Sequence, residues 1–176
     1  MTQNVLDTVG LLYSASSEEP DWEAVYTEQL PRVYNFLRYR LGNETLAQDL
    51  TSRTFEKAWR ERRRYRRDLA KFSTWLLQIA RNVAVDHYRT RHEHAPLEAA
   101  AEVPADGTPE EEAVIRSNLE RLSLLAEQLT DRERELLAFK YGAGATNRAI
   151  AEVTGLSESN VGTILHRAVQ ILRDKW

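Results

Sequence analysis

The last third of the chain constrains its fold most tightly, because two helical apolar stripes flank a sharp break in the sequence. The stripes cover residues 147–153 and continue from Val161, on either side of Thr154-Gly155-Leu156. Glycine is the residue type that best accepts a left-handed backbone, and Ser157 stands where it would cap the following helix. The pattern predicts a helix-turn-helix, a motif whose second helix lies in the major groove of DNA.

Composition narrows the classes of protein that fit. A chain of 176 residues is long enough for one medium-sized domain or two small ones. The absence of cysteine excludes disulfides, thiolate metal ligands and a cysteine nucleophile. The first residues lack the basic start and apolar run of a signal peptide, and no segment resembles a membrane span. We therefore expect a cytoplasmic protein without membrane insertion.

Charge is distributed unevenly along the chain, although the net charge is only −3. No lysine or arginine precedes Arg32, residues 53–67 are densely basic, and residues 93–112 are acidic. A local basic patch is sufficient to attract phosphate groups, so a nucleic-acid-binding protein need not be basic overall.

Periodicity predicts an all-α fold of two small helical domains joined by a flexible acidic linker. We expect a flexible acidic tail at residues 1–20, a first domain at 21–92, the linker at 93–110 and a second domain at 111–176. Pro31 is expected to kink or divide the first helix. Before the helix-turn-helix, the predicted helices span residues 21–41, 44–60, 73–91, 111–129 and 131–141, with Asn43 capping the second and Thr130 the last, where Glu133 completes a capping box.

A basic and aromatic run covers residues 53–75. Arginine attracts phosphate, and aromatic rings such as Tyr65, Phe72 and Trp75 offer stacking surfaces for unpaired bases. The alternative is a solvated basic helix end whose aromatic side chains belong to the core.

Catalytic and metal chemistry find little support in the sequence. His87, His92 and His94 are poorly spaced for a shared helix face, so we expect no metal site. The acidic residues 110–112 suit a helix N-terminus rather than an acid/base pair. No nucleophile with its base and no phosphate-binding glycine loop is visible, so we expect no enzyme and no cofactor.

The helix-turn-helix itself suggests DNA contacts. Arg148 stands in the first turn of its first helix, where a cation commonly meets phosphate, and an ordinary exposed arginine is the equal alternative. On the second helix, Asn160 is suited to pair with adenine, and Arg167 with guanine or phosphate.

The order of these parts resembles a bacterial RNA polymerase sigma factor of the extracytoplasmic-function (ECF) type, over residues 22–173. LAQDLTSRTFEKAW (46–59) and FSTWLLQIARNVAVDHYR (72–89) are similar to sigma region 2 of the sigma-70 family. LTDRERELLAFKYGAGATNRAIAEVTGLSESNVGTILHRAVQILR (129–173) is similar to sigma region 4. The resemblance implies a subunit that binds core polymerase, recognises the −10 and −35 promoter elements and promotes melting.

The resemblance also implies roles for individual residues. Those assigned to the −10 element and melting are Arg62, Arg63, Tyr65, Arg66, Lys71, Phe72, Ser73, Trp75, Gln78, Arg81 and Asn82, with Asn82 reading an extruded base. Those assigned to the −35 element are Arg148, Ser157, Ser159, Asn160, Thr163, His166 and Arg167. Those assigned to the clamp helices of the largest polymerase subunit are Asp49, Leu50, Ser52, Arg53, Phe55, Glu56 and Trp59.

Two departures from the family pattern stand out. Ser52 and Arg53 replace residues that the family often uses in its polymerase-binding helix. In the recognition helix, Gly162 and Ile164 replace basic residues, which would remove two potential DNA contacts.

The implied partners are core RNA polymerase (the clamp helices and the flap), promoter DNA and an anti-sigma factor. Two rival interpretations remain open at this point. One is a free-standing helix-turn-helix regulator whose first domain dimerises or senses a ligand. The other is an interaction protein that keeps the sigma shape without promoter activity.

Overall fold

The structure is a computed structural model that describes residues 21–66, 70–91, 125 and 128–175, within which all regular structure is helical. The N-terminal group contains α2 (Trp22–Leu41), α3 (Glu44–Glu61), the 3-10 turn η1 (Arg62–Arg64) and α4 (Phe72–Arg91). The C-terminal group contains α6 (Asp131–Leu137), the π-helical η2 (Ala138–Gly142), α7 (Asn147–Thr154) and α8 (Glu158–Asp174). The all-helical prediction is confirmed for these residues. The expected tail (1–20), linker (93–110) and most of the helix expected at 111–129 lie outside them.

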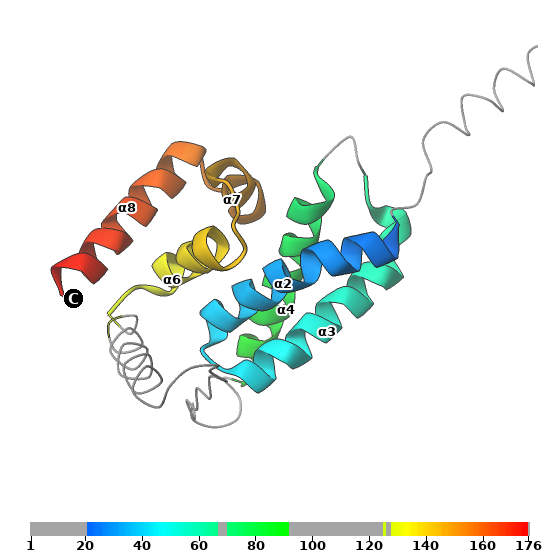
Figure 1. The fold of residues 1–176 in the computed structure, drawn as a ribbon. Helices are drawn as coiled ribbons and strands as arrows, with labels where there is room; N and C mark the ends of the chain where they lie inside the picture. Colours follow the sequence, from blue (N-terminus) through cyan, green and yellow to red (C-terminus); the bar gives the residue numbers. More distant parts are fainter. Residues whose placement is uncertain (1–20, 67–69, 92–124, 126–127, 176) are drawn as a thin grey trace, which may run out of the picture.

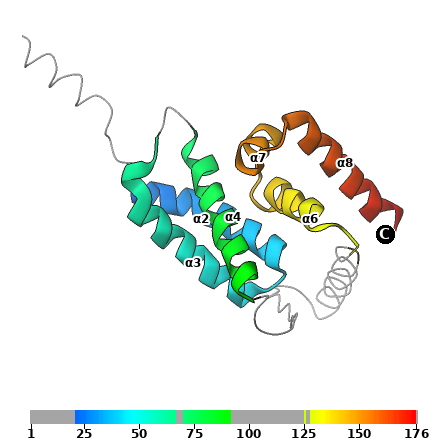
Figure 2. The ribbon, with the colours of Figure 1, turned by 180° about the vertical axis from the view of Figure 1, so that it is seen from behind.

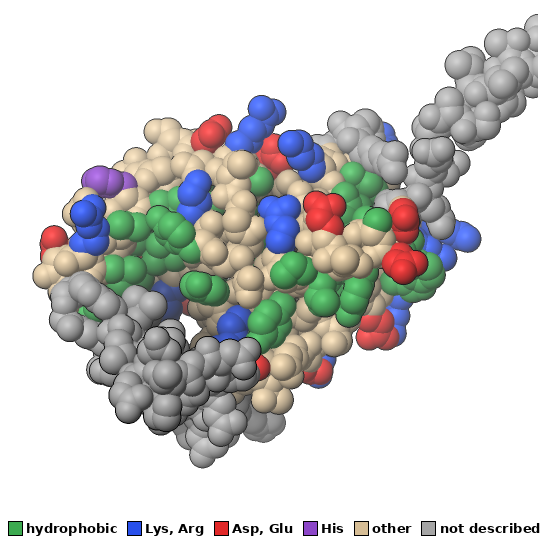
Figure 3. Space-filling view, viewed as in Figure 1, with side chains coloured by type: hydrophobic (Ala, Val, Ile, Leu, Met, Phe, Trp, Pro, Cys, Tyr) green, Lys and Arg blue, Asp and Glu red, His purple; other side chains and the backbone are tan. Residues whose placement is uncertain are grey.

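The two groups pack against each other, as the two opposite views show (Figures 1 and 2). α2 lies along α6 and η2, while α4 contacts α7. The space-filling view shows the groups as one continuous body, with acidic and basic side chains interspersed on the visible face (Figure 3).

Side-chain caps start the helices where the sequence predicts. Asn43 accepts a hydrogen bond from the Leu46 amide at 2.8 Å, and Ser157 accepts one from the Asn160 amide at 3.2 Å. Gly155 ends α7 in the left-handed region with φ 73°. These bonds satisfy backbone donors that have no partner within the helix, so helix boundaries follow directly from residue type.

Pro31 does not divide the first helix, contrary to one of the two expectations. α2 runs without a break from Trp22 to Leu41 with Pro31 inside it. Proline removes the amide that would bond to the Thr27 carbonyl. Both Pro31 and Thr27 are exposed, so water can hydrate that carbonyl.

The predicted helix at 131–141 changes from α-helix to π-helix near its C-terminal end. α6 stops at Leu137, and the chain continues as the π-helical turn η2. There the Ala143 amide donates to the Ala138 carbonyl at 3.1 Å, five residues back rather than four. The wider turn places Phe139 and Gly142 against α2.

A single apolar core runs through both groups of helices. Phe36 of α2 stacks on Phe139 of η2, with ring centroids 4.2 Å apart and planes at 16°. Both rings are almost completely buried. The buried cluster continues through the residues Val33, Leu37, Leu50, Leu76, Leu136, Ile150, Val161 and Leu165. The sequence predicted two domains but did not predict that they share a core.

Two aromatic side chains of the N-terminal helices lie about half in solvent. The exposed fractions are 48% for Tyr26 and 47% for Trp59. Each contacts another ring, Phe55 for Tyr26 and Trp22 for Trp59.

No helix in the described ranges has the length and apolarity needed to cross a membrane.

Gly162 allows a test of how the backbone conformation at a glycine affects stability. A Cβ at this position would meet only Asn147 Nδ2, at an ordinary 3.6 Å. We therefore expect Gly162→Ala to raise the free energy of unfolding by about 0.5–1 kcal/mol in urea titrations, because alanine reduces the entropy of the unfolded chain. Gly155→Ala, at φ 73°, is the matched control and should lower stability. A destabilising Gly162→Ala would contradict the assigned packing.

Candidate nucleic-acid interface

Five aromatic side chains gather where α2 begins, α3 ends and α4 begins. Trp22 contacts Trp59 edge-on at 5.1 Å and Phe72 at 5.6 Å between ring centroids. Tyr65 contacts Phe72 at 5.1 Å and Trp75 at 5.3 Å, and Phe72 contacts Trp75 at 5.3 Å. These geometries are those that aromatic pairs favour. We call these five residues the aromatic cluster.

The aromatic cluster fixes the basic loop between α3 and α4. Arg62 places its guanidinium 4.1 Å from the Trp59 ring centroid and donates to the Trp59 carbonyl at 2.8 Å. The Tyr65 hydroxyl donates to the Ala70 carbonyl across the loop at 3.1 Å. The rings pack together, as the core alternative for the run at 53–75 expects, and all of them keep some exposure. Their role as a stacking surface for bases stays a prediction.

Basic side chains of the loop point to solvent around this cluster. Arg63, Arg66 and Lys71 are exposed, while Ser73 of the first turn of α4 is half-buried. Positive charge beside partly exposed rings is the combination that binds a single strand, with phosphates on the cations and bases on the rings.

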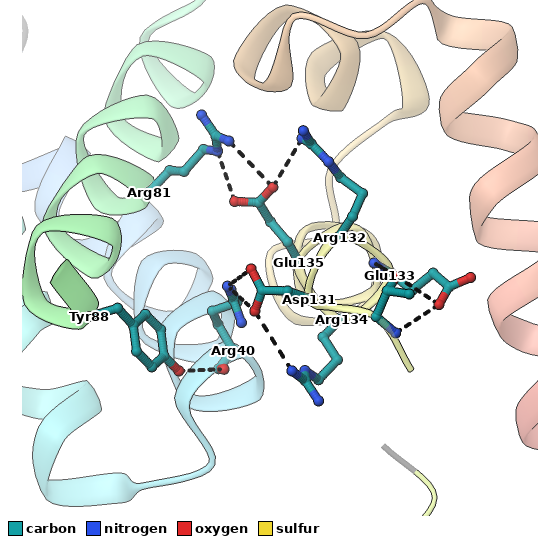
Figure 4. A network of polar contacts seen from close by, with 9 residues as sticks. Arg40, Arg81, Tyr88, Asp131, Arg132, Glu133, Arg134 and Glu135 are labelled. Carbon is teal, nitrogen blue, oxygen red and sulfur yellow. Dashed lines mark hydrogen bonds and ion pairs between the residues drawn. The ribbon is translucent and has the colours of Figure 1, made fainter. Parts of the chain in front are cut away.

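Farther along α4, two amide side chains form a pair. Gln78 donates to Asn82 Oδ1 at 3.2 Å, one helical turn apart, and Asn82 is exposed. The neighbouring Arg81 turns toward the C-terminal helices and donates to Glu135 of α6 at 2.8 Å (Figure 4). Of the predicted −10 residues on α4, Asn82 is thus open to solvent, whereas Arg81 is engaged inside the molecule.

The predicted recognition helix, α8, exposes most of its assigned residues. Ser157, Ser159, Asn160, Thr163 and His166 are all exposed. Gly162 faces Asn147, and Ile164 packs against the core, so both substituted positions lie toward the protein.

Arg167 is tied to the start of α6 by the capping box. It donates to Glu133 Oε1 at 2.8 Å, while Thr130 donates to Glu133 Oε2 from its amide at 2.9 Å and its hydroxyl at 2.8 Å. The box that the sequence predicted is therefore confirmed. Burial alone would raise the pKa of the Glu133 carboxyl, but the hydrogen bonds from Thr130 and Arg167 hold the pKa below its ordinary value of 4.5.

Arg148 is also engaged. It lies 3.5 Å from Glu152 one turn along α7, with both side chains largely in solvent. Such an exposed pair is weakly held, so Arg148 can turn to another anion at little cost.

The residues assigned to polymerase divide into two sets. Asp49, Ser52, Arg53, Glu56 and Trp59 lie on the exposed face of α3, where Arg53 pairs with Asp49 at 3.0 Å and Glu56 with Arg60. Leu50 is fully buried and Phe55 is 8% exposed. These two support the helix from inside and are corrected here to core residues.

Sequence reasoning missed two carboxylates of α6 that contact the N-terminal helices. Asp131 accepts from Arg40 Nη2 at 2.7 Å on both oxygens, and Glu135 holds Arg81 (Figure 4). Their spacing of four residues on one helix face was the available signal, but nothing in the sequence says which surface that face meets.

No cluster of metal-ligating side chains occurs within the described residues. His92 and His94, considered above for a metal, lie outside them.

Both groups of helices match models of one protein family. The Sigma-70 region 2 model matches residues 25–93, and the Sigma-70, region 4 model matches residues 119–172. The RNA polymerase sigma factor CarQ of Myxococcus xanthus is 31% identical over 87% of this chain and 87% of its own length. The ECF RNA polymerase sigma factor BldN of Streptomyces coelicolor is 30% identical over 92% of this chain, which spans 63% of BldN.

Solved structures share the fold across both groups of helices. The sigma factor RpoE of Bartonella quintana, in complex with the anti-sigma factor NepR, has a TM-score of 0.72 at 20% identity, over 88% of this chain and 95% of that one. CnrH, in complex with the cytosolic domain of CnrY, has a TM-score of 0.65 at 22% identity, over 86% and 84%.

The Glu133 network predicts an acid-sensitive C-terminal domain. Because the pKa of Glu133 is lowered on folding, its stabilisation is present above pH 4.5 and is lost as the pH falls through the folded value. Glu133→Gln should reduce the free energy of unfolding by about 1–2 kcal/mol at pH 7, since glutamine keeps the cap but not the charge.

Urea titrations of both proteins from pH 7 to pH 3 measure this difference, which should narrow below pH 4.5. Glu152→Gln, which removes a carboxylate from an exposed pair, is the control and should change stability by less than about 0.5 kcal/mol. A difference that stays constant with pH would contradict the role of the Glu133 charge.

Proposed function

Because the chain belongs to the sigma-70 family of RNA polymerase sigma factors, in its ECF group, we propose that it is a promoter-specificity subunit. In this proposal it acts in the cytoplasm, binds core polymerase, recognises the −10 and −35 elements and promotes melting. Sigma factors are not enzymes as a family, and we assign the chain no catalysis.

The strongest support for the proposal is the order of three features between the end of α3 and the middle of α4. The basic loop, the aromatic cluster and the Gln78–Asn82 pair follow one another from the end of α3 along α4. Phosphate attraction, base stacking and hydrogen bonding to a base edge are the three requirements for holding an unpaired strand. A stand-alone regulator that binds intact duplex DNA needs neither the basic loop, the aromatic cluster nor the amide pair in its first domain.

Melting then follows from binding energy alone. Unstacking and unpairing a base costs a few kcal/mol, and stacking on an aromatic ring returns about 1–3 kcal/mol for each base. Asn82 is the exposed residue of α4 best suited to read such a base, because its amide donates and accepts at once.

The −35 element is assigned to α8. Its N-terminal half presents Ser159, Asn160, Thr163 and His166 to solvent. Thr163 Oγ1 donates to the Ser159 carbonyl at 3.1 Å, which leaves its oxygen lone pairs and methyl group for a base. Arg167 would have to leave Glu133 before it could contact DNA, so we assign it first to positioning α8 on α6.

Core polymerase is assigned to the exposed face of α3, through Asp49, Ser52, Arg53, Glu56 and Trp59. The alternating charges along this face are satisfied by pairs within the helix, and a polar partner can exchange such pairs without leaving a buried charge. An anti-sigma factor is a further proposed partner, supported by the complexes in which the two structural relatives were solved.

Binding to core polymerase tests the proposed function first. The purified chain should co-elute stoichiometrically with bacterial core RNA polymerase from a sizing column. Trp59→Ala should weaken that binding, whereas Tyr39→Ala, which removes a still more exposed aromatic side chain on α2, should not. Absence of binding by a folded chain would favour the stand-alone regulator, and tight polymerase-free binding to duplex DNA would establish it.

A second variant separates melting from polymerase binding. Asn82→Ala should reduce open-complex formation by about tenfold while leaving co-elution with polymerase unchanged, since one base contact is worth about 1–3 kcal/mol. Permanganate footprinting on a promoter selected by the wild-type holoenzyme measures the open complex. Arg89→Ala, exposed near the end of the same helix, is the control. Equal loss of melting and polymerase binding would refute the role of Asn82.

A further inference from the structure

The indole ring of Trp22, the first residue of α2, contacts both ends of the basic loop. It meets Trp59, near the end of α3, and Phe72, the first residue of α4. Within the described part of the chain, Trp59 and Phe72 make no ring contact with each other. We propose that Trp22 is a positioning residue of the DNA-binding surface, which sets the spacing between the arginines at the start of the loop and the stacking rings at its end. The proposal rests on the proposed function, because it takes the loop as the site of the unpaired strand.

The start of the loop is fixed to Trp59. The Arg62 guanidinium lies 4.1 Å from the Trp59 ring centroid and donates to the Trp59 carbonyl at 2.8 Å. Arg63 follows in the same 3-10 turn, with its side chain exposed. The Tyr65 amide closes this turn by donating to the Arg62 carbonyl at 3.2 Å. The place of Arg62 and Arg63 therefore follows from the place of Trp59.

The end of the loop is held by a different group of rings. Tyr65 contacts Phe72 and Trp75, and the latter two contact each other at 5.3 Å. Phe72 and Trp75 are partly exposed and also pack against the core. None of these contacts involves Trp22, and neither do those between Arg62 and Trp59. Trp22 adds one ring contact to each group and so joins the two groups side by side.

The start of α2 determines where the Trp22 ring lies. Asp21 caps the helix by accepting hydrogen bonds from the Glu23 amide at 3.1 Å and the Ala24 amide at 3.2 Å. The indole Nε1 of Trp22 is buried and has no hydrogen-bond partner among the residues that the structure describes. Edge-on contacts, with interplanar angles of 79° and 81°, therefore hold the ring. Trp22→Phe keeps an aromatic ring and loses no hydrogen bond.

The spacing that Trp22 sets matters because a single strand must place phosphates on cations and bases on rings at the same time. Each phosphate contact adds about 0.7 to the slope of log affinity against log salt concentration for a single strand. If the two groups separate, bases can still stack on Phe72 and Trp75, but the strand loses phosphate contacts at the start of the loop. A smaller salt slope is thus the signature of lost positioning. Partial unfolding lowers the amount of active protein and leaves that slope unchanged.

The test measures binding of an unpaired strand by holoenzyme. Core RNA polymerase is assembled with each protein and the complex is purified, so that differences in polymerase binding do not enter. The probe is the fluorescein-labelled non-template strand of the −10 region of a promoter selected by the wild-type holoenzyme. Trp22→Ala should weaken binding about tenfold at low salt and reduce the salt slope by about 0.7, the loss of one phosphate contact. Trp22→Phe should restore most of both.

Two further variants identify the mechanism. Tyr26, one turn along α2, contacts Phe55 of α3 at 4.8 Å, so Tyr26→Ala removes a comparable ring pair away from the loop and should leave the salt slope unchanged. Arg63→Ala should reduce the slope as much as Trp22→Ala does. Combining the two should cost nothing more, because residues that act through one contact are not additive. If Trp22→Ala fails to fold, Trp22→Leu, which keeps apolar bulk without a ring, takes its place.

The outcomes separate this inference from the proposed function. An unchanged salt slope in Trp22→Ala, or in Trp22→Leu where that variant replaces it, would overturn the positioning role. An equal change in Tyr26→Ala, or additive losses with Arg63→Ala, would overturn it as well. Failure of the wild-type chain to bind core polymerase would instead overturn the proposed function, and this inference with it.

Discussion

The stacking of Phe36 on Phe139, made possible by the bare backbone at Gly142, determines how the rest of the molecule is arranged. This contact brings α6 beside α2 and α4, and only then can Asp131 and Glu135 reach the arginines of the N-terminal helices. Burial of apolar side chains stabilises the packing of the two groups of helices without fixing their relative orientation. The ion pairs and the hydrogen bond from Arg32 to the Ala143 carbonyl fix that orientation. Two family-typical domains thereby become one body.

Local structure could be predicted from the sequence because its causes are local. Asn43, Thr130 and Ser157 start their helices with side-chain bonds to nearby amides, and Gly155 ends one with a left-handed backbone. The continuous passage of α2 through Pro31 and the π-turn of η2 were not predictable in this way. Both depend on what surrounds the helix, which is solvent at Pro31 and the facing α2 backbone at Gly142.

Some residues of the candidate site could be predicted and others could not, again because the contacts of a side chain depend on what surrounds its helix. Residue types and the helix-turn-helix pattern were sufficient to propose the basic loop and the exposed face of α8, and the family resemblance added Asn82. The structure leaves Asn82 and the N-terminal half of α8 in solvent. The resemblance assigned Leu50 and Phe55 of α3 to polymerase contact, whereas the structure buries both side chains in the core. Nor could it reveal that Arg81 and Arg167 are held by Glu135 and Glu133, since those partners are 54 and 34 residues away in the chain.

Arg81, which is predicted to bind the −10 element, is held by Glu135 of α6, so this ion pair and promoter binding by Arg81 should exclude each other. The most direct measurement is energy transfer between dyes on the two domains of the wild-type chain, first free, then with core polymerase, then with promoter DNA added. High transfer in the free chain and low transfer in the complete complex are expected. High transfer that persists in a transcriptionally active promoter complex would contradict this account.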